Sequence, residues 1–368
     1  MLSPLDDYPI HQIAEPVRRV GTSDRNFYDR YYFNMHGCGD ELFLVAGMGQ
    51  YPNLSVQDAF VLVVKDGIHR VVRGSRVLGS DRMDLSVGPI RIEVIEGLKR
   101  LRLAVEPNPH GVAADLTWNG AVPAHLEPPH RHRQFERLIF DTQRLWQTGC
   151  WEGWLEVAGE RVEIGPDRWW GTRDRSWGVR PVGEPEPPGV RASDPNHGMF
   201  WSYAPMQFAD HSIMYICQES PTGERVLEEA VRVWVDPERE PEPLGRPEFD
   251  FELAPGTREV RRATLHLREP DGSPLDVEVE PLMKCHVTSG TGYGFDADWR
   301  HGMYQGKLVV QGVELDYADP EDQKRLMAFI DTVARFRAKD QVGYGLFEYF
   351  IFGPNRRFGF QGFEDVAG

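Results

Sequence analysis

The length, composition and charge of the chain set the first limits. It has 368 residues, of which 40% are hydrophobic and 27% are charged, as is typical of a globular protein. A single hydrophobic core rarely grows beyond about 250–300 residues, so we expect two domains. The formal net charge of -16 argues against nucleic-acid binding and against docking on anionic lipid, because both need clustered Lys and Arg.

The sequence shows neither a basic start followed by an apolar run nor an apolar run of about 20 residues. We therefore expect a cytoplasmic protein without stable membrane insertion. Cys38, Cys150, Cys217 and Cys285 are widely spaced and form no CxxC motif, which favours reduced thiols over disulfides or a zinc site. These features leave the oligomeric state open.

The first half of the chain predicts a meander of short strands. Alternating segments between turn residues favour a mainly antiparallel β fold. The expected strands are 26–36, 42–48, 59–65, 69–73, 90–95, 98–106, 111–119, 151–157 and 160–164. This succession is typical of an up-and-down barrel or a sandwich.

Residues 181–196 contain five prolines and three acidic residues and cannot build a core, so we expect a linker there. It would separate an N-terminal β domain, 1–180, from a C-terminal β domain, 197–368. The expected strands after it are 199–206, 212–218, 230–235, 249–253, 259–267, 275–281, 306–311 and 345–352. Residues 320–338 predict one C-terminal helix, because Leu326, Ile330, Val333 and Phe336 form an apolar stripe after Pro320.

Residues 168–178 have the most unusual composition in the chain. They read Arg-Trp-Trp-Gly-Thr-Arg-Asp-Arg-Ser-Trp-Gly, with three tryptophans, three arginines, one aspartate and no aliphatic side chain. A core strand is normally rich in Val, Ile and Leu, and a solvated loop normally avoids Trp. We therefore predict a strand that either lines a pocket or clamps two domains together.

Strand alternation divides this segment into two faces. One face carries Trp170, Thr172, Asp174 and Ser176, and the other carries Trp169, Arg173, Arg175 and Trp177. In an apolar, aromatic setting desolvation would raise the pKa of Asp174, and a carboxyl protonated near neutral pH can act as a general acid. The alternative is that an ion pair with Arg173 or Arg175 lowers the pKa of Asp174 and makes it a structural clamp.

Several other side chains are candidates for contacting the same ligand. Within the segment these are Trp170, Thr172, Arg173 and Trp177. Elsewhere they are aromatic, histidine or amide side chains of expected strands and of a second aromatic-ionic cluster: Trp154, His197, Trp201, Tyr203, Asn34, His36, Trp299, His301 and Tyr304. A lone histidine is more often a hydrogen-bonded structural residue than a base.

Cofactor and metal motifs are missing from the sequence. His125, His130 and His132 cluster, but the adjacent arginines repel a cation and no acidic ligand is interleaved, so we expect a solvated loop without a metal. There is no Walker loop, no GxGxxG after a strand, no GxSxG and no HExxH. We therefore expect chemistry without a cofactor, and not phosphoryl transfer, nicotinamide chemistry or serine hydrolysis.

The run Asp174-Arg175-Ser176-Trp177-Gly178 resembles the Asp-His-x-Trp-Gly signature of the carotenoid 1,2-hydratase (hydroxyneurosporene synthase) superfamily and its AttH-like bacterial relatives. The resemblance implies two lipocalin-like (calycin) β-barrels side by side, with an apolar ligand space near the signature and Asp174 as proton donor. Arg175 replaces the signature His, and Thr172 stands where carotenoid hydratases carry Tyr. A different apolar substrate is therefore expected, such as a terpenoid, steroid, polyketide or fatty-acyl compound.

These observations lead to one main hypothesis and two alternatives. The main hypothesis is a cofactor-independent lyase or isomerase that hydrates, dehydrates or cyclises an apolar small molecule, with Asp174 as proton donor. The first alternative is a carrier that binds such a ligand without chemistry, since fold does not fix function. The second is a structural partner protein in a biosynthetic complex.

Overall fold

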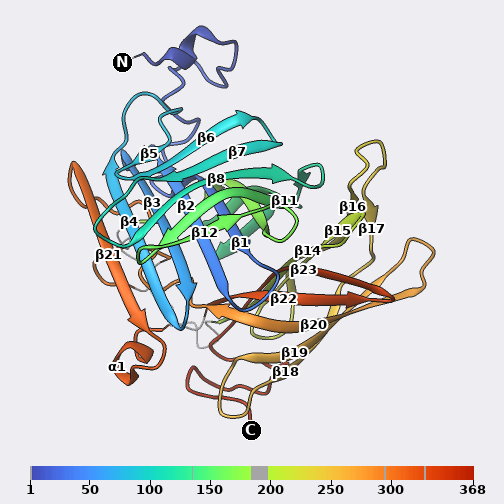
Figure 1. Cartoon of the computed structure of the whole chain (residues 1–368). Helices are drawn as coiled ribbons and strands as arrows, with labels where there is room; N and C mark the ends of the chain where they lie inside the picture. The colour runs from blue at the N-terminus through green and yellow to red at the C-terminus, as the bar shows by residue number, and fades with distance from the viewer. Residues whose placement is uncertain (1, 135, 184–197, 294–295, 327–328) are drawn as a thin grey trace.

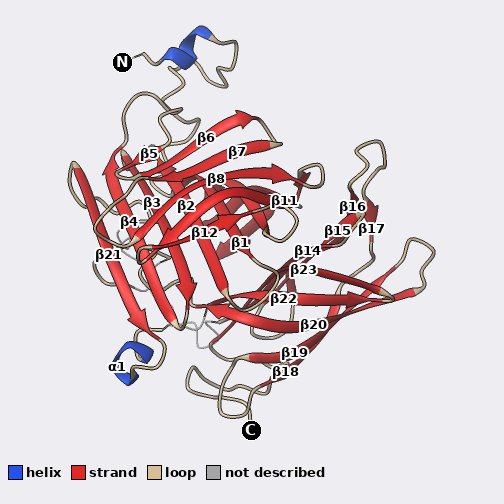
Figure 2. Ribbon diagram, viewed as in Figure 1, coloured by secondary structure: helices blue, strands red, loops and turns tan. Residues whose placement is uncertain are grey.

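The computed structural model describes residues 2–134, 136–183, 198–293, 296–326 and 329–368. Over these residues the protein is nearly all β, with two curled antiparallel sheets (Figures 1 and 2). The described helices are short: η1, a 3-10 turn at Pro4–Asp7, and the α-helix α1 at Pro320–Gln323. The prediction of a mainly antiparallel β fold made of two barrel-like units is confirmed, with one unit a nearly closed barrel and the other a half-barrel. No described helix has the length and apolar composition needed to cross a membrane.

The first sheet forms a nearly closed barrel. Its order is β21-β4-β3-β2-β1-β13-β11-β8-β7-β6-β5, with β9, β10 and β12 also paired to β11. The sheet curls until β5 and β6 return to β3, which brings its edges together. Its strands are β1 (Phe27–His36), β2 (Leu42–Tyr51), β3 (Val56–Lys65), β4 (Ile68–Val77), β5 (Ser86–Val87), β6 (Ile90–Glu96), β7 (Arg100–Val105), β8 (Val112–Gly120), β9 (His125–Leu126), β10 (His130–Gln134), β11 (Arg137–Val157), β12 (Glu160–Ile164), β13 (Trp170–Val179) and β21 (Leu308–Asp316).

The second sheet is a half-barrel that lies against the first (Figure 1). Its order is β17-β16-β15-β14-β23-β22-β20-β19-β18. Its strands are β14 (Met199–Gln207), β15 (His211–Glu219), β16 (Arg225–Trp234), β17 (Glu242–Pro243), β18 (Glu248–Leu253), β19 (Val260–Arg268), β20 (Pro274–Cys285), β22 (Ile330–Ala338) and β23 (Gln341–Phe352).

One strand crosses the expected domain division. β21 lies in the expected C-terminal domain, yet it pairs with β4 along its whole length, from Leu308 opposite Arg76 to Asp316 opposite Ile68. The second half of the chain therefore completes the edge of the first sheet. Most of the expected linker, 181–196, lies outside the described residues, so its position stays a prediction.

The predicted helix over 320–338 is wrong for most of its length. The α-helix ends at Gln323, and residues 330–338 form β22, hydrogen-bonded between β20 and β23. The even positions from 330 to 338 are mostly apolar and pack into the core of the second sheet. Their two-residue period is that of a strand. A short apolar segment can fit both helical and strand spacing, and here pairing on both sides decides for the strand.

Both faces of the strands between the two sheets are buried. On β1, Phe33 and Met35 point into the barrel, where they pack with Trp118 and Trp151. The intervening Tyr32 faces the second sheet and belongs to the apolar layer between the sheets. A strand buried on both faces loses the simple alternation of apolar and polar residues, as the sequence of β2 shows. Any pocket in the layer between the sheets is therefore lined by side chains from both halves of the chain.

Candidate functional site

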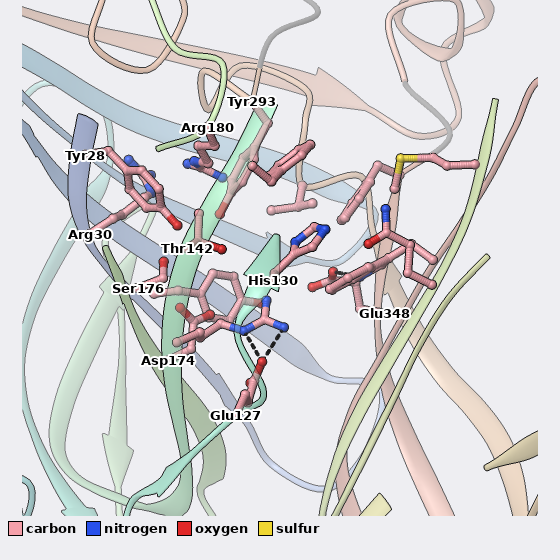
Figure 3. A pocket seen from close by; sticks show the side chains of 18 of the residues that line it. Tyr28, Arg30, Glu127, His130, Thr142, Asp174, Ser176, Arg180, Tyr293 and Glu348 are labelled. Atoms are coloured by element: carbon pink, nitrogen blue, oxygen red, sulfur yellow. Dashed lines mark hydrogen bonds and ion pairs between the residues drawn. The ribbon is translucent and has the colours of Figure 1, made fainter. Parts of the chain in front are cut away.

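A pocket of about 240 Å³ lies between the two sheets (Figure 3). The first sheet and its loops contribute Tyr28, Arg30, Tyr32, Glu127, Pro128, His130, Phe140, Thr142, Arg144, Asp174, Ser176 and Arg180. The second sheet and its loops contribute Met199, Trp201, Gln218, Val287, Tyr293, Phe329, Asp331 and Glu348. Aromatic rings thus alternate with ionisable groups around a space of small-molecule size, a combination typical of ligand sites.

β13 brings Asp174 to this pocket. The strand runs between β1 and β11, and its register places Asp174 between Tyr32 and Trp146. Alternation then points Asp174 and Ser176 outward from the barrel, toward the second sheet. The residues on either side of Asp174 point the other way.

The flanking arginines have partners of their own. The Arg173 side chain is buried and its Nε donates to Gln147 Oε1 at 2.8 Å. Arg175 pairs with Asp29 and lies over the ring of Tyr31. Neither arginine therefore clamps Asp174.

The carboxyl of Asp174 is half-buried in the pocket wall, and no described residue forms a hydrogen bond or ion pair with it. Burial raises its pKa above the ordinary value for an aspartate. The guanidinium groups of Arg144, Arg180 and Arg30 act in the opposite direction from a distance, with Arg144 the strongest. Asp174 is therefore a desolvated carboxyl within the field of several cations.

Glu127 and Arg144 form an ion pair on the same wall. Nε and Nη2 of Arg144 both lie 2.7 Å from Glu127 Oε2, and the Tyr203 hydroxyl donates to Glu127 Oε1 at 3.3 Å. Burial raises the pKa of Glu127 to about 7, although Arg144 lowers it. The Arg144 guanidinium also lies over the rings of Trp201 and Tyr203. This pair joins the first sheet to β14 of the second.

Asp331 and Glu348 are the acids of the opposite wall. They lie directly opposite each other on β22 and β23. The Tyr32 hydroxyl donates to Asp331 Oδ2 at 2.5 Å, and the indole N–H of Trp201 donates to a carboxylate oxygen of Glu348. Burial raises the pKa of both carboxyls.

His130, on β10, also lines the pocket. Its ring stacks on Phe140 with centroids 4.7 Å apart, and its Nε2 is buried without a hydrogen-bond partner among the described residues. Burial lowers its pKa to about 4, so the imidazole is neutral at physiological pH. The prediction of a solvated loop for this histidine is wrong, because β10 folds back on β11 and carries His130 into the layer between the sheets.

Among the residues predicted for the site, Asp174 and Trp201 line the pocket, and Tyr203 lies just behind its wall on Glu127. Trp170 lies farther along β13 and contacts Tyr344 edge to face. Thr172 is hydrogen-bonded to Asn34 through both its hydroxyl and its backbone N–H. Trp170, Thr172 and Asn34 therefore connect neighbouring strands and do not line the pocket.

The remaining candidates also lie elsewhere. His36 is fully buried, Arg173 and Trp177 are on the barrel-facing side of β13, and Trp154 packs under Arg161. In the loop after β20, the ring of Trp299 lies under Arg73, the ring of His301 stacks on Phe60, and Tyr304 is 65% exposed. The candidates not found lining the pocket are Trp154, Trp170, Thr172, Arg173, Trp177, Tyr203, Asn34, His36, Trp299, His301 and Tyr304. His197 lies outside the described residues.

Sequence reasoning missed seven acidic, basic or histidine residues of the pocket: Arg30, Glu127, His130, Arg144, Arg180, Asp331 and Glu348. Asp331 was hidden by the helix prediction, and Glu348 lies in a strand whose sequence is dominated by aromatic residues. The available signal was an acidic residue within an otherwise apolar strand. Burying a charge is costly, so such a residue indicates a structural or functional role. The described residues contain no group of three or more His, Cys, Asp or Glu side chains placed to hold a metal ion.

Comparisons with known proteins place the chain in a family. It belongs to DUF8625, a family of unknown function, which matches residues 2–361. No curated protein matches the sequence.

Two solved structures share the fold. An AttH-like protein from Nitrosomonas europaea is 13% identical with a TM-score of 0.53, over 95% of this chain and 99% of that one. Kievitone hydratase from Nectria haematococca is 15% identical with a TM-score of 0.52, over 90% of this chain and 93% of that one. At such low identity these similarities show the fold alone, and they confirm the lipocalin-like architecture.

Proposed function

We propose that this protein is a cofactor-independent acid–base enzyme that adds water to an apolar small molecule, removes it, or cyclises such a molecule, with Asp174 as proton donor. One observation carries the proposal: a desolvated carboxyl without a hydrogen-bond or ion-pair partner among the described residues lies in the wall of the pocket between the sheets. A carboxyl with a raised pKa can hold a proton near neutral pH and release it to a substrate.

The walls support an apolar substrate with a cationic intermediate. The rings of Tyr28, Phe140, Trp201, Tyr293 and Phe329 line the pocket and offer π faces to an alkene and to a developing carbocation. A terpenoid, steroid, polyketide or fatty-acyl skeleton matches this lining. One protein with the same fold is named a hydratase, so the architecture is compatible with water addition, although fold alone does not establish a reaction.

The density of charge in the walls favours an enzyme over a carrier. Four carboxyls and three guanidinium groups line the pocket. A site that only stores an apolar ligand gains nothing from burying charges, which are costly to desolvate.

The test uses deuterium as the reporter. The protein is incubated in deuterated water with a lipid extract and with a mixture of terpenoid alkenes, sterols and unsaturated fatty acids, and the products are analysed by mass spectrometry. A proton delivered to carbon by an acid in exchange with solvent leaves deuterium on the product. Asp174→Asn should reduce turnover about 100-fold or more while ligand binding and melting temperature are kept.

The matched control is Asp167→Asn, an exposed aspartate just before β13, which should behave as wild type. A bound species recovered unchanged and free of carbon-bound deuterium would instead establish a carrier. If Asp174→Asn unfolds the protein, Asp174 has a structural role and its assignment as proton donor is overturned.

A further inference from the structure

Asp331 and Glu348 are paired by the geometry of the second sheet. They are directly opposite residues of the antiparallel strands β22 and β23, and both side chains face the pocket. Cβ atoms of such pairs lie about 4.5–5.5 Å apart, within contact range for two carboxyls. Figure 3 shows Glu348 across the pocket from Asp174.

Among the described residues, hydrogen-bond donors contact Asp331 and Glu348, but no cationic side chain forms an ion pair with either acid. Tyr32, from β1, donates to Asp331, and Trp201, from β14, donates to Glu348. The second oxygen of Asp331, Oδ1, is buried and has no hydrogen-bond donor among the described residues other than the facing carboxyl. In the part of the chain that the structure describes, no Lys, Arg or His forms an ion pair with either acid, and every arginine and histidine lining the pocket comes from the first sheet and its loops.

Two adjacent buried carboxyls without a contacting cation cannot both be ionised, because like charges repel strongly in a low dielectric. The more distant groups that face the pair are Arg144 on β11 and Asp174 on β13. Arg144 lowers the pKa of Glu348, whereas Asp174 and Asp331 raise it. The balance keeps one proton on the pair, and the pair titrates as a unit.

We propose that Asp331 and Glu348 share a proton and form the second acid–base group of the pocket, the one that exchanges a proton with the oxygen of water or of a leaving hydroxyl. This inference rests on the proposed function. In hydration, the Asp174 proton forms a C–H bond with the electrons of the alkene, and a carbocation remains. Water then forms the C–O bond, and the ionised carboxylate of the pair accepts the proton that leaves this oxygen.

Protons are conserved over this reaction cycle. The substrate gains one water molecule, Asp174 loses one proton and the pair gains one, and exchange with solvent restores both groups. In dehydration the same groups act in reverse: the pair protonates the hydroxyl as it leaves, and the Asp174 carboxylate removes a proton from carbon.

The shared proton can be tested without any substrate. Infrared spectroscopy separates the C=O stretch of a protonated carboxyl from the bands of carboxylates. In the Asp174→Asn variant, at a pH above the value of about 7 for Glu127, a protonated carboxyl should remain and should disappear when Asp331→Asn and Glu348→Gln are added. Asp331→Asn alone should lower the pH at which this band is lost by about one unit or more, since a neighbouring negative charge is gone.

The matched control is Glu280→Gln, which removes a strand carboxylate of the same sheet that is paired with Arg335 outside the pocket. This change should leave the band and its titration unaltered. Absence of the band in Asp174→Asn, or an unchanged midpoint after Asp331→Asn, overturns the shared proton.

The catalytic role has a separate readout. With the probe mixture in deuterated water, Asp331→Asn and Glu348→Gln should each reduce kcat about 100-fold or more, with little change in KM and with loss of the acidic limb of the pH–rate profile. Unchanged kcat in both variants overturns the role in proton exchange. If wild type shows no turnover while the infrared result holds, the proposed function and the catalytic role fail, but the proton-sharing pair stands.

Discussion

The two walls of the pocket carry the same kind of acid in opposite electrostatic settings. On the first sheet, Glu127 is paired with Arg144, and Asp174 lies in the field of Arg144, Arg180 and Arg30. On the second sheet, Asp331 and Glu348 face each other, and the described lining residues of that wall include no Arg, Lys or His. Neighbouring charges, and not residue type, therefore distinguish the two walls: the carboxyls of the first wall have cations nearby, whereas the two carboxyls of the second wall have each other as nearest charged neighbours.

The largest effect on stability is expected from breaking the ion pair on the first wall. Arg144→Met leaves Glu127 buried without its cation and should lower the free energy of unfolding by about 3 kcal/mol, measured by urea denaturation. Adding Glu127→Gln should recover much of the loss, because the unpaired charge is then removed. If the double variant is as unstable as the sum of the single variants, the pair carries no coupling.

A smaller effect is expected from removing the donor that bridges the two walls. Tyr32→Phe deletes the hydrogen bond to Asp331 Oδ2 and should cost about 1–2 kcal/mol of stability. The pKa of Asp331 should rise further, since its ionised form loses a donor, and infrared titration would report this shift. Tyr28→Phe is the control, because Tyr28 lines the same pocket on the same strand without a side-chain hydrogen bond in the described structure. If Tyr32→Phe and Tyr28→Phe changed the stability and the pKa of Asp331 to the same extent, Tyr32 would have no bridging role.

The acid pair also predicts how stability depends on pH. Burial raises the pKa of Glu348 in the folded state, so between its ordinary value near 4.5 and the folded value the native protein holds more protons than the unfolded chain. Stability must therefore fall as pH rises through this window, and Glu127 acts in the same direction up to about pH 7. The melting temperature of Glu348→Gln, measured across this pH range, should vary less with pH than that of the wild type. A wild-type profile that rises throughout the window would contradict this assignment.

The smallest effect is expected at the aromatic candidates outside the pocket. Tyr304 is 65% exposed and does not line the pocket, so Tyr304→Ala should change the unfolding free energy by no more than about 0.5 kcal/mol and leave turnover intact. Urea denaturation measures the unfolding free energy, and the deuterium assay measures turnover. A loss of turnover here would extend the site beyond the two walls.

Local patterns were enough to predict the class of fold and two residues that line the pocket, Asp174 and Trp201. Alternation between turn residues indicated an antiparallel β protein, and the composition of 168–178 marked β13. The period of two along that strand correctly separated Asp174 from Arg173 and Arg175, because side-chain direction in a strand is a local property. It could not show which cations approach Asp174 from other strands.

Tertiary structure decided everything that depends on pairing between distant segments. The sequence alone determined a β-rich chain with an isolated acid among aromatic residues. Only the fold made 330–338 a strand, because its hydrogen bonds come from β20 and β23, and only the register of β22 with β23 set Asp331 opposite Glu348. Their proton affinity follows from desolvation and from charges that lie far away in sequence, and no local pattern records either quantity.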